Sequence, residues 1–66
     1  MTITVNGEKR TCAPGTTVTD LLADLGLGPK GSAVAVNGEV LPRTTWPEHA
    51  LADGDDVDVL TAVQGG

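Results

Sequence analysis

The sequence predicts an α+β fold in which a mixed sheet of about five strands packs against one main helix. Two strand-like segments are each followed by an Asn-Gly pair, the preferred two-residue hairpin turn. A third segment has apolar residues at the spacing of an amphipathic helix. A last alternating segment, residues 57–63, can pair in parallel with the first strand if the helix crosses one face of the sheet.

The chain begins with a predicted β-hairpin. Residues 1–5 alternate polar and apolar side chains and are rich in β-branched residues, as expected of a half-buried strand. Asn6-Gly7 then favours a type I′ turn. The returning strand, residues 8–12, is more polar, which suits the edge of a sheet.

A short helix is predicted to follow. Thr17 can cap its first turn, and Asp20 lies where the helix dipole favours a negative charge. Gly26 is placed to end the helix in a left-handed conformation. The apolar stripe of the helix consists of Val18, Leu21, Leu22 and Leu25. A helix of two to three turns is not stable alone in water, so it must pack on the sheet.

The second half of the chain predicts three more strands. Residues 33–36 and 39–41 flank the second Asn-Gly turn. Residues 43–52 are expected to be irregular, with one helical turn near residues 48–50, and residues 57–63 form the final strand. This order of elements is that of the β-grasp fold. We therefore expect one domain over residues 1–63 and a flexible Gly-Gly tail over residues 64–66.

The two faces of the final strand have different predicted roles, because side chains alternate along a strand. One face should pack under the helix and against the first strand: Val57, Val59, Thr61 and Val63 with Ile3, Val5, Leu21, Leu22 and Leu25. The other face should be the open face of the sheet. Its side chains, Asp58, Leu60 and Ala62, are candidates for docking a partner protein.

Composition excludes several classes of function. The 66 residues have a formal net charge of −5, which argues against nucleic-acid binding and against attachment to anionic membranes. No apolar stretch approaches the ~18–20 residues of a membrane span. The first residues lack the layout of a signal peptide, so a cytoplasmic location is expected.

Few side chains offer chemistry of their own. Cys12 is the only cysteine and His49 the only histidine, so an intrachain disulfide and a Cys/His zinc site are excluded. Cys12 is expected to pack as a small apolar residue, and Trp46 to cover one end of the core. The acidic residues of 53–58 lack the later glutamate of an EF-hand, so a solvated turn that steers partners is the preferred interpretation.

A resemblance to a known family adds a function. Three segments carry it: TVTDLLADL (17–25), AVAVNGEVLPRTTW (33–46) and DGDDVDVLTAVQGG (53–66). Together with the N-terminal hairpin, they make the whole chain resemble the ThiS family of sulfur carriers in thiamine biosynthesis, within the ubiquitin-like β-grasp superfamily. Asp58 departs from the family pattern, which usually has an apolar residue there.

The resemblance implies a protein co-substrate rather than an enzyme. A partner adenylyltransferase of the ThiF type, related to ubiquitin-activating enzymes, would activate the Gly66 carboxylate with ATP and Mg²⁺. A persulfide donor would then supply the sulfur of a C-terminal thiocarboxylate, and a ThiG-type thiazole synthase would consume it. Gln64 and Gly65 would thread the tail into these enzymes. The chain itself would bind no cofactor and no metal.

Other interpretations of the sequence stay open. The chain could be a β-grasp sulfur carrier of another pathway, molybdopterin or cysteine synthesis, or a ubiquitin-like modifier. It could also be a plain interaction module with an inert tail. Adding one residue after Gly66 separates these classes, because it should abolish a carrier and hardly affect a docking module.

Overall fold

The computed structural model describes residues 1–28 and 30–61 of the chain. The elements follow one another as β1 (Thr2–Val5), β2 (Glu8–Thr11), α1 (Val18–Asp24), β3 (Ser32–Val36), β4 (Glu39–Leu41), the 3₁₀ helix η1 (Arg43–Glu48) and β5 (Asp56–Thr61). The strands form one mixed sheet in the order β2-β1-β5-β3-β4. Strands β1 and β5 are parallel, and the other pairings are antiparallel. The predicted β-grasp architecture is confirmed.

Local sequence explains the two hairpins and the helix. Asn6 and Asn37 both have a positive φ, 51° and 52°, as a type I′ turn requires. Thr17 accepts a hydrogen bond from the Asp20 amide at 3.1 Å, and the Asp20 carboxylate accepts one from the Thr17 amide, which together make a capping box. Gly26 ends this segment with φ +77°.

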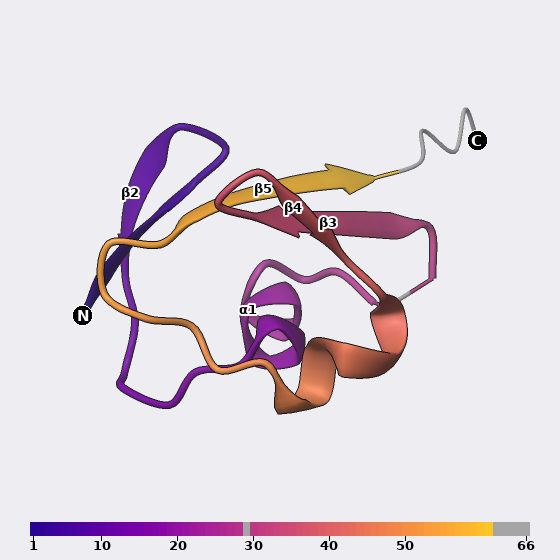
Figure 1. Cartoon of the computed structure of the whole chain (residues 1–66), viewed down its shortest axis with the longest axis horizontal. Helices are drawn as coiled ribbons and strands as arrows, with labels where there is room; N and C mark the ends of the chain where they lie inside the picture. Colours follow the sequence, from indigo (N-terminus) through magenta and orange to yellow (C-terminus); the bar gives the residue numbers. More distant parts are fainter. Residues whose placement is uncertain (29, 62–66) are drawn as a thin grey trace.

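The core lies between the sheet and one layer of helices. Figure 1 shows α1 and η1 on the same side of the sheet. The buried apolar residues are Ile3, Val5, Val18, Leu21, Leu22, Val34, Val36, Trp46, Leu51, Val57 and Val59. Alternate residues of β1, β3 and β5 therefore supply one wall, and α1 supplies the other.

The segment after β4 differs from its prediction. The helical turn expected near residues 48–50 is wrong: the turn is a 3₁₀ helix that begins at Arg43 and ends at Glu48. The indole of Trp46 is 2% exposed and its Nε1–H donates to the Leu41 carbonyl at 3.1 Å. The buried Trp46 thus lies within this turn, and Pro47, which has no backbone N–H to donate, lies one residue before the turn ends.

Candidate functional site

The strand that precedes the C-terminal residues lies at the centre of the sheet. β5 pairs with β1 on one side and with β3 on the other. Its pairing with β3 extends to its last residue, Thr61, which lies opposite Ser32. Its pairing with β1 is shorter, because that register contains only Thr4–Asp56 and Val5–Val57. In Figure 1 the gold arrow of β5 points toward the C-terminal end of the chain.

The open face of β5, where the sequence predicts a docking surface, has an exposed leucine beside an exposed aspartate. Leu60 is 70% exposed and Asp58 is exposed beside it on the same face. A shallow depression of about 50 Å³ lies over this face and is lined in part by Asp58, Leu60 and Val40. Small-molecule sites usually enclose about 300–1,000 Å³. The depression is therefore much smaller than a usual small-molecule site.

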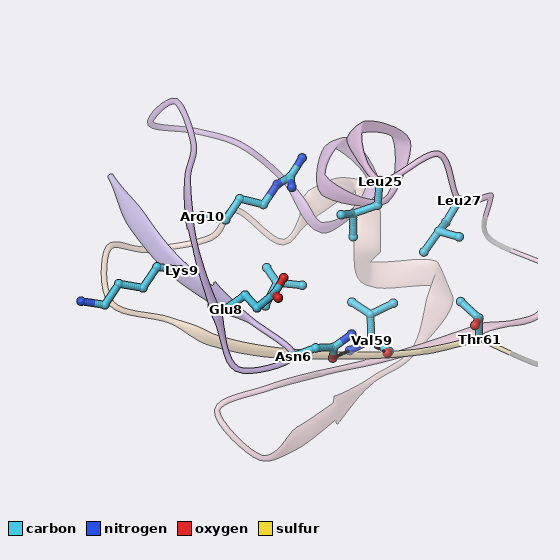
Figure 2. A pocket seen from close by; sticks show the side chains of 9 residues that line it. Asn6, Glu8, Lys9, Arg10, Leu25, Leu27, Val59 and Thr61 are labelled. Carbon is cyan, nitrogen blue, oxygen red and sulfur yellow. Dashed lines mark hydrogen bonds between the residues drawn. The ribbon is translucent and has the colours of Figure 1, made fainter.

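The opposite face of β5 ends beside a larger open pocket. Its volume is about 360 Å³, and it lies between the first hairpin and the C-terminal end of α1. Figure 2 shows Leu25, Leu27, Val59 and Thr61 around one part of it and the Lys9 side chain directed away. The prediction that Thr61 packs under the helix is wrong, because Thr61 is exposed at the edge of this pocket.

The helix is too short to cover Thr61. Seven residues of α-helix span about 10 Å, whereas the six residues of β5 span about 20 Å. Leu25, predicted in the fully packed set, is only half-buried because it follows the last residue of α1.

The remaining predicted site residues lie outside the described part of the chain. These are Ala62, which was expected in the docking surface, Gln64 and Gly65, which were expected to thread the tail, and Gly66, which was expected to bear the reactive carboxylate. Val63, expected in the packed row, is also outside it. The structure thus fixes the position of β5, from which this segment continues.

Comparison with known proteins identifies the family. The model of the ThiS family matches residues 3–66. The chain belongs to the ThiS family. It is 36% identical to the sulfur carrier protein ThiS of Escherichia coli (strain K12) over 66 residues, which are the whole of both chains. It matches the crystal structure of the thiamine biosynthesis protein ThiS from Geobacter metallireducens with a TM-score of 0.83 and 38% identity, over the full length of both chains.

A further relative places a ThiS-like sequence within an enzyme. The chain is 33% identical over 66 residues to the thiazole synthase of Paramagnetospirillum magneticum, where the match spans 20% of that protein's length. The relatives that match this ThiS-family chain over their full length are named as a carrier protein and a thiamine biosynthesis protein. ThiS carriers are protein co-substrates, so the chain is not classed as an enzyme.

The other candidate residues of this ThiS-family chain have structural roles. Cys12 is half-buried and packs against the core, as predicted. Trp46 is buried and belongs to the core. Among residues 1–28 and 30–61, no three His, Cys, Asp or Glu side chains are close enough to hold a metal ion. In the same part of the chain, no helix has the length and hydropathy needed to cross a membrane.

Two of the acidic residues are used to build the turn before β5. The Asp53 carboxylate accepts from the Thr2 amide at 2.7 Å. The Asp55 carboxylate accepts from the Ala52 amide at 2.8 Å and from Nδ2 of Asn37 at 3.1 Å. The prediction of an acidic turn is correct, but these carboxylates also tie β5 to its neighbours in the sheet.

Sequence reasoning missed the role of the two asparagine side chains. Asn6 and Asn37 were interpreted only as turn residues. Oδ1 of Asn6 accepts from the Val59 amide at 2.8 Å, and Oδ1 of Asn37 accepts from the Asp56 amide at 3.0 Å. The turn motif gave the conformation of both residues, but their bonding partners are 53 and 19 positions away in sequence.

Proposed function

We propose that this protein is a sulfur carrier of thiamine biosynthesis whose Gly66 carboxylate is adenylated and then converted to a thiocarboxylate. The observation on which the proposal depends is the match to the ThiS family through residue 66, at a Gly-Gly sequence. The sulfur would be used to form the thiazole ring. The chain supplies the group that reacts, and its partners supply the catalysis.

The chemistry of a carboxylate explains why a partner is needed. The α-carboxylate is ionised at neutral pH, and its delocalised charge makes it a poor electrophile. In the proposed first step, a carboxylate oxygen attacks the α-phosphorus of ATP and pyrophosphate leaves. Mg²⁺ and the nucleotide belong to the ThiF-type adenylyltransferase. The product is an acyl adenylate, in which AMP is a good leaving group.

Sulfur transfer then follows from the acyl adenylate. The terminal sulfur of a persulfide bonds to the carbonyl carbon, and AMP leaves. A thiol next attacks the sulfur–sulfur bond, which releases the thiocarboxylate and forms a disulfide. The thiocarboxylate is the sulfur donor for a ThiG-type thiazole synthase. A thiazole synthase that contains a ThiS-like segment supports this choice of partner.

The glycines suit entry into a narrow active site. Gly65 and Gly66 have no Cβ, so they accept conformations and close approaches that other residues cannot. An extended tail of residues 64–66 would reach about 10 Å beyond the domain. We expect this length to carry the carboxylate into a buried site while residues 1–63 stay outside it.

The open face of β5 is the proposed docking surface for the partners. It consists of Asp58, Leu60 and Ala62, and the exposure of Leu60 supports it. An acidic chain is suited to a basic surface on the partner. Because adenylation consumes ATP, the same proposal places the protein in the cytoplasm.

Intact-mass measurement tests the proposal directly. The protein is incubated with ATP, Mg²⁺, a ThiF-type adenylyltransferase and a persulfide donor. We expect the mass to rise by the difference between one sulfur and one oxygen, with the change located at Gly66 by fragmentation. An unchanged mass with an enzyme that charges its own carrier would contradict the proposal.

Two variants define what the reaction needs. Adding one residue after Gly66 should abolish the mass change, because the carboxylate no longer lies at the reacting position. Gly66→Ala should reduce the rate of charging, because the added methyl group would clash with the walls of the partner's active site. The melting temperature should not change, because the substitution lies outside the core. Charging of Gly66→Ala at the normal rate would remove the steric part of the proposal.

A further inference from the structure

The side chain of Asn6 binds the strand that leads to the reactive carboxylate. Its Oδ1 accepts a hydrogen bond from the Val59 amide at 2.8 Å, and its Nδ2 donates one to the Val59 carbonyl at 3.2 Å. Figure 2 shows this pair of bonds beside the open pocket. The backbone amide of Asn6 also donates to the Val57 carbonyl at 2.9 Å. One turn residue therefore bonds to β5 at two alternate residues, Val57 and Val59, on the β1 side.

These bonds extend the sheet beyond the point where β1 turns away. The parallel register of β1 and β5 ends with Val5 opposite Val57, and the chain then reverses at Asn6-Gly7. A carboxamide has one acceptor and donor N–H groups, like the peptide group of a neighbouring strand. The Asn6 side chain takes the place of such a strand at Val59. On its β1 side, β5 is therefore hydrogen-bonded as far as Val59, two residues before its last residue, Thr61.

We propose that Asn6 is a positioning residue for the carrier reaction. By holding both polar groups of the Val59 backbone, it fixes the direction in which the chain leaves the sheet toward Gly66. Without the Asn6 side chain, only β3 would hold the end of β5. On that side, Leu60 pairs with Ala33, and Thr61 pairs with Ser32. This inference rests on the proposed function, because the direction of the tail matters only if the tail reacts.

The second Asn-Gly turn supplies a matched control. Asn37 has the same turn position and nearly the same φ, and its Oδ1 accepts from the Asp56 amide at 3.0 Å. Its backbone amide donates to the Asp56 carbonyl at 2.7 Å. These bonds act at the first residue of β5, far along the strand from Thr61. The two asparagines thus make comparable bonds to the same strand, but only Asn6 acts near the end that leads to the tail.

The experiment compares Asn6→Gly with Asn37→Gly. Glycine accepts the positive φ of both turns, so each variant keeps the turn and its backbone hydrogen bond to β5 and loses only the side-chain bonds. Both should lower the melting temperature by a similar amount. In charging assays with varied carrier concentration, Asn6→Gly should lower kcat about tenfold with KM unchanged, because misplacing a reacting group slows the chemical step. Asn37→Gly should keep kcat within about twofold of the wild type.

Amide measurements check the physical basis independently of any enzyme. Hydrogen exchange at Val59 and the NMR order parameter at Thr61 should report greater mobility in Asn6→Gly and little change in Asn37→Gly. If Asn6→Gly is not folded at the assay temperature, Asn6→Asp takes its place. That variant keeps an acceptor for the Val59 amide, loses the donor to the Val59 carbonyl, and should also lower kcat.

Each outcome decides a different point. A loss of kcat confined to the Asn6 variants supports the positioning role. Equal losses in the Asn6 and Asn37 variants, or normal kcat in both, would overturn it and leave Asn6 with a role in stability only. If the wild-type protein is not charged by an active adenylyltransferase, the proposed function fails, and the positioning role fails with it even where the amide measurements still detect the Asn6 bonds.

Discussion

Leu60→Ala gives the most direct test of the docking surface on β5. Leu60 is 70% exposed in the isolated chain, so its side chain contributes little to the core. The substitution should change the free energy of unfolding by no more than about 0.5 kcal/mol. Any larger effect on binding a partner can then be attributed to the surface rather than to the fold.

The expected loss of affinity follows from the exposed area. Replacing Leu with Ala removes roughly three carbon groups, each worth about 0.8 kcal/mol when fully buried. If docking buries the 70% of Leu60 that is now exposed, the loss is about 1.7 kcal/mol. That free energy corresponds to about a 15-fold increase in Kd.

Calorimetric titration with a ThiF-type adenylyltransferase measures this Kd. Thr11→Ala is the control, because Thr11 is exposed on β2, at the other edge of the sheet, and does not line the depression beside Leu60. Its Kd should stay within about twofold of the wild type. Melting temperatures of both variants show whether each remains folded.

Two results would refute the reasoning. A Leu60→Ala protein that is folded and binds within about twofold of the wild type would mean that Leu60 is not buried by the partner. An equal loss in Thr11→Ala would mean that contact over the whole sheet, rather than the β5 surface, determines affinity.

Three further substitutions test single interactions. Thr17→Ala should lower the free energy of unfolding by about 1 kcal/mol in a denaturant titration, because it removes the acceptor for the Asp20 amide. Thr19→Ala, on the exposed side of α1, is the control and should lower the free energy of unfolding less. Trp46→Phe should cost about 1–3 kcal/mol, since it leaves the Leu41 carbonyl without its indole donor; an unchanged unfolding midpoint would show that this bond contributes nothing. Asp58→Asn should lower the association rate with a basic partner about two- to threefold at low salt, an effect that salt should remove. Asp24→Asn makes the same change of net charge on the exposed side of α1, and an equal effect there would assign the steering to net charge alone.

The parts of the fold that local chemistry determines were predictable from the sequence. The positive φ of Asn6 and Asn37 follows from the Asn-Gly pairs, and the first turn of α1 follows from Thr17 and Asp20. Alternation placed Val57 and Val59 in the core and Leu60 on the open face. Each of these inferences needed only residues within a few positions of one another.

The errors arose where distant parts of the chain meet. The exposure of Thr61 depends on where α1 ends in space, and a strand's alternation cannot supply that information. The 3₁₀ helix depends on the burial of Trp46 against the core, and a Trp-Pro pair does not indicate its bounds. The bonds of Asn6 to Val59 join turn and strand across 53 positions. An Asn-Gly pair favours a turn whether or not the asparagine side chain also bonds to a distant strand, so the pair alone does not predict these bonds.

The central position of β5 separates two ways in which a substitution can impair this protein. An edge strand can open by itself, but opening β5 breaks its pairing with both β1 and β3 and exposes the core residues Val57 and Val59. A substitution in the core should therefore reduce charging mainly through the fraction of molecules that are folded. Leu60→Ala and Asn6→Gly act on molecules that are still folded, one through binding of the partner and the other through the direction of the tail. Charging rates measured well below the melting temperature and divided by the folded fraction would be normal for a core variant and reduced for these two.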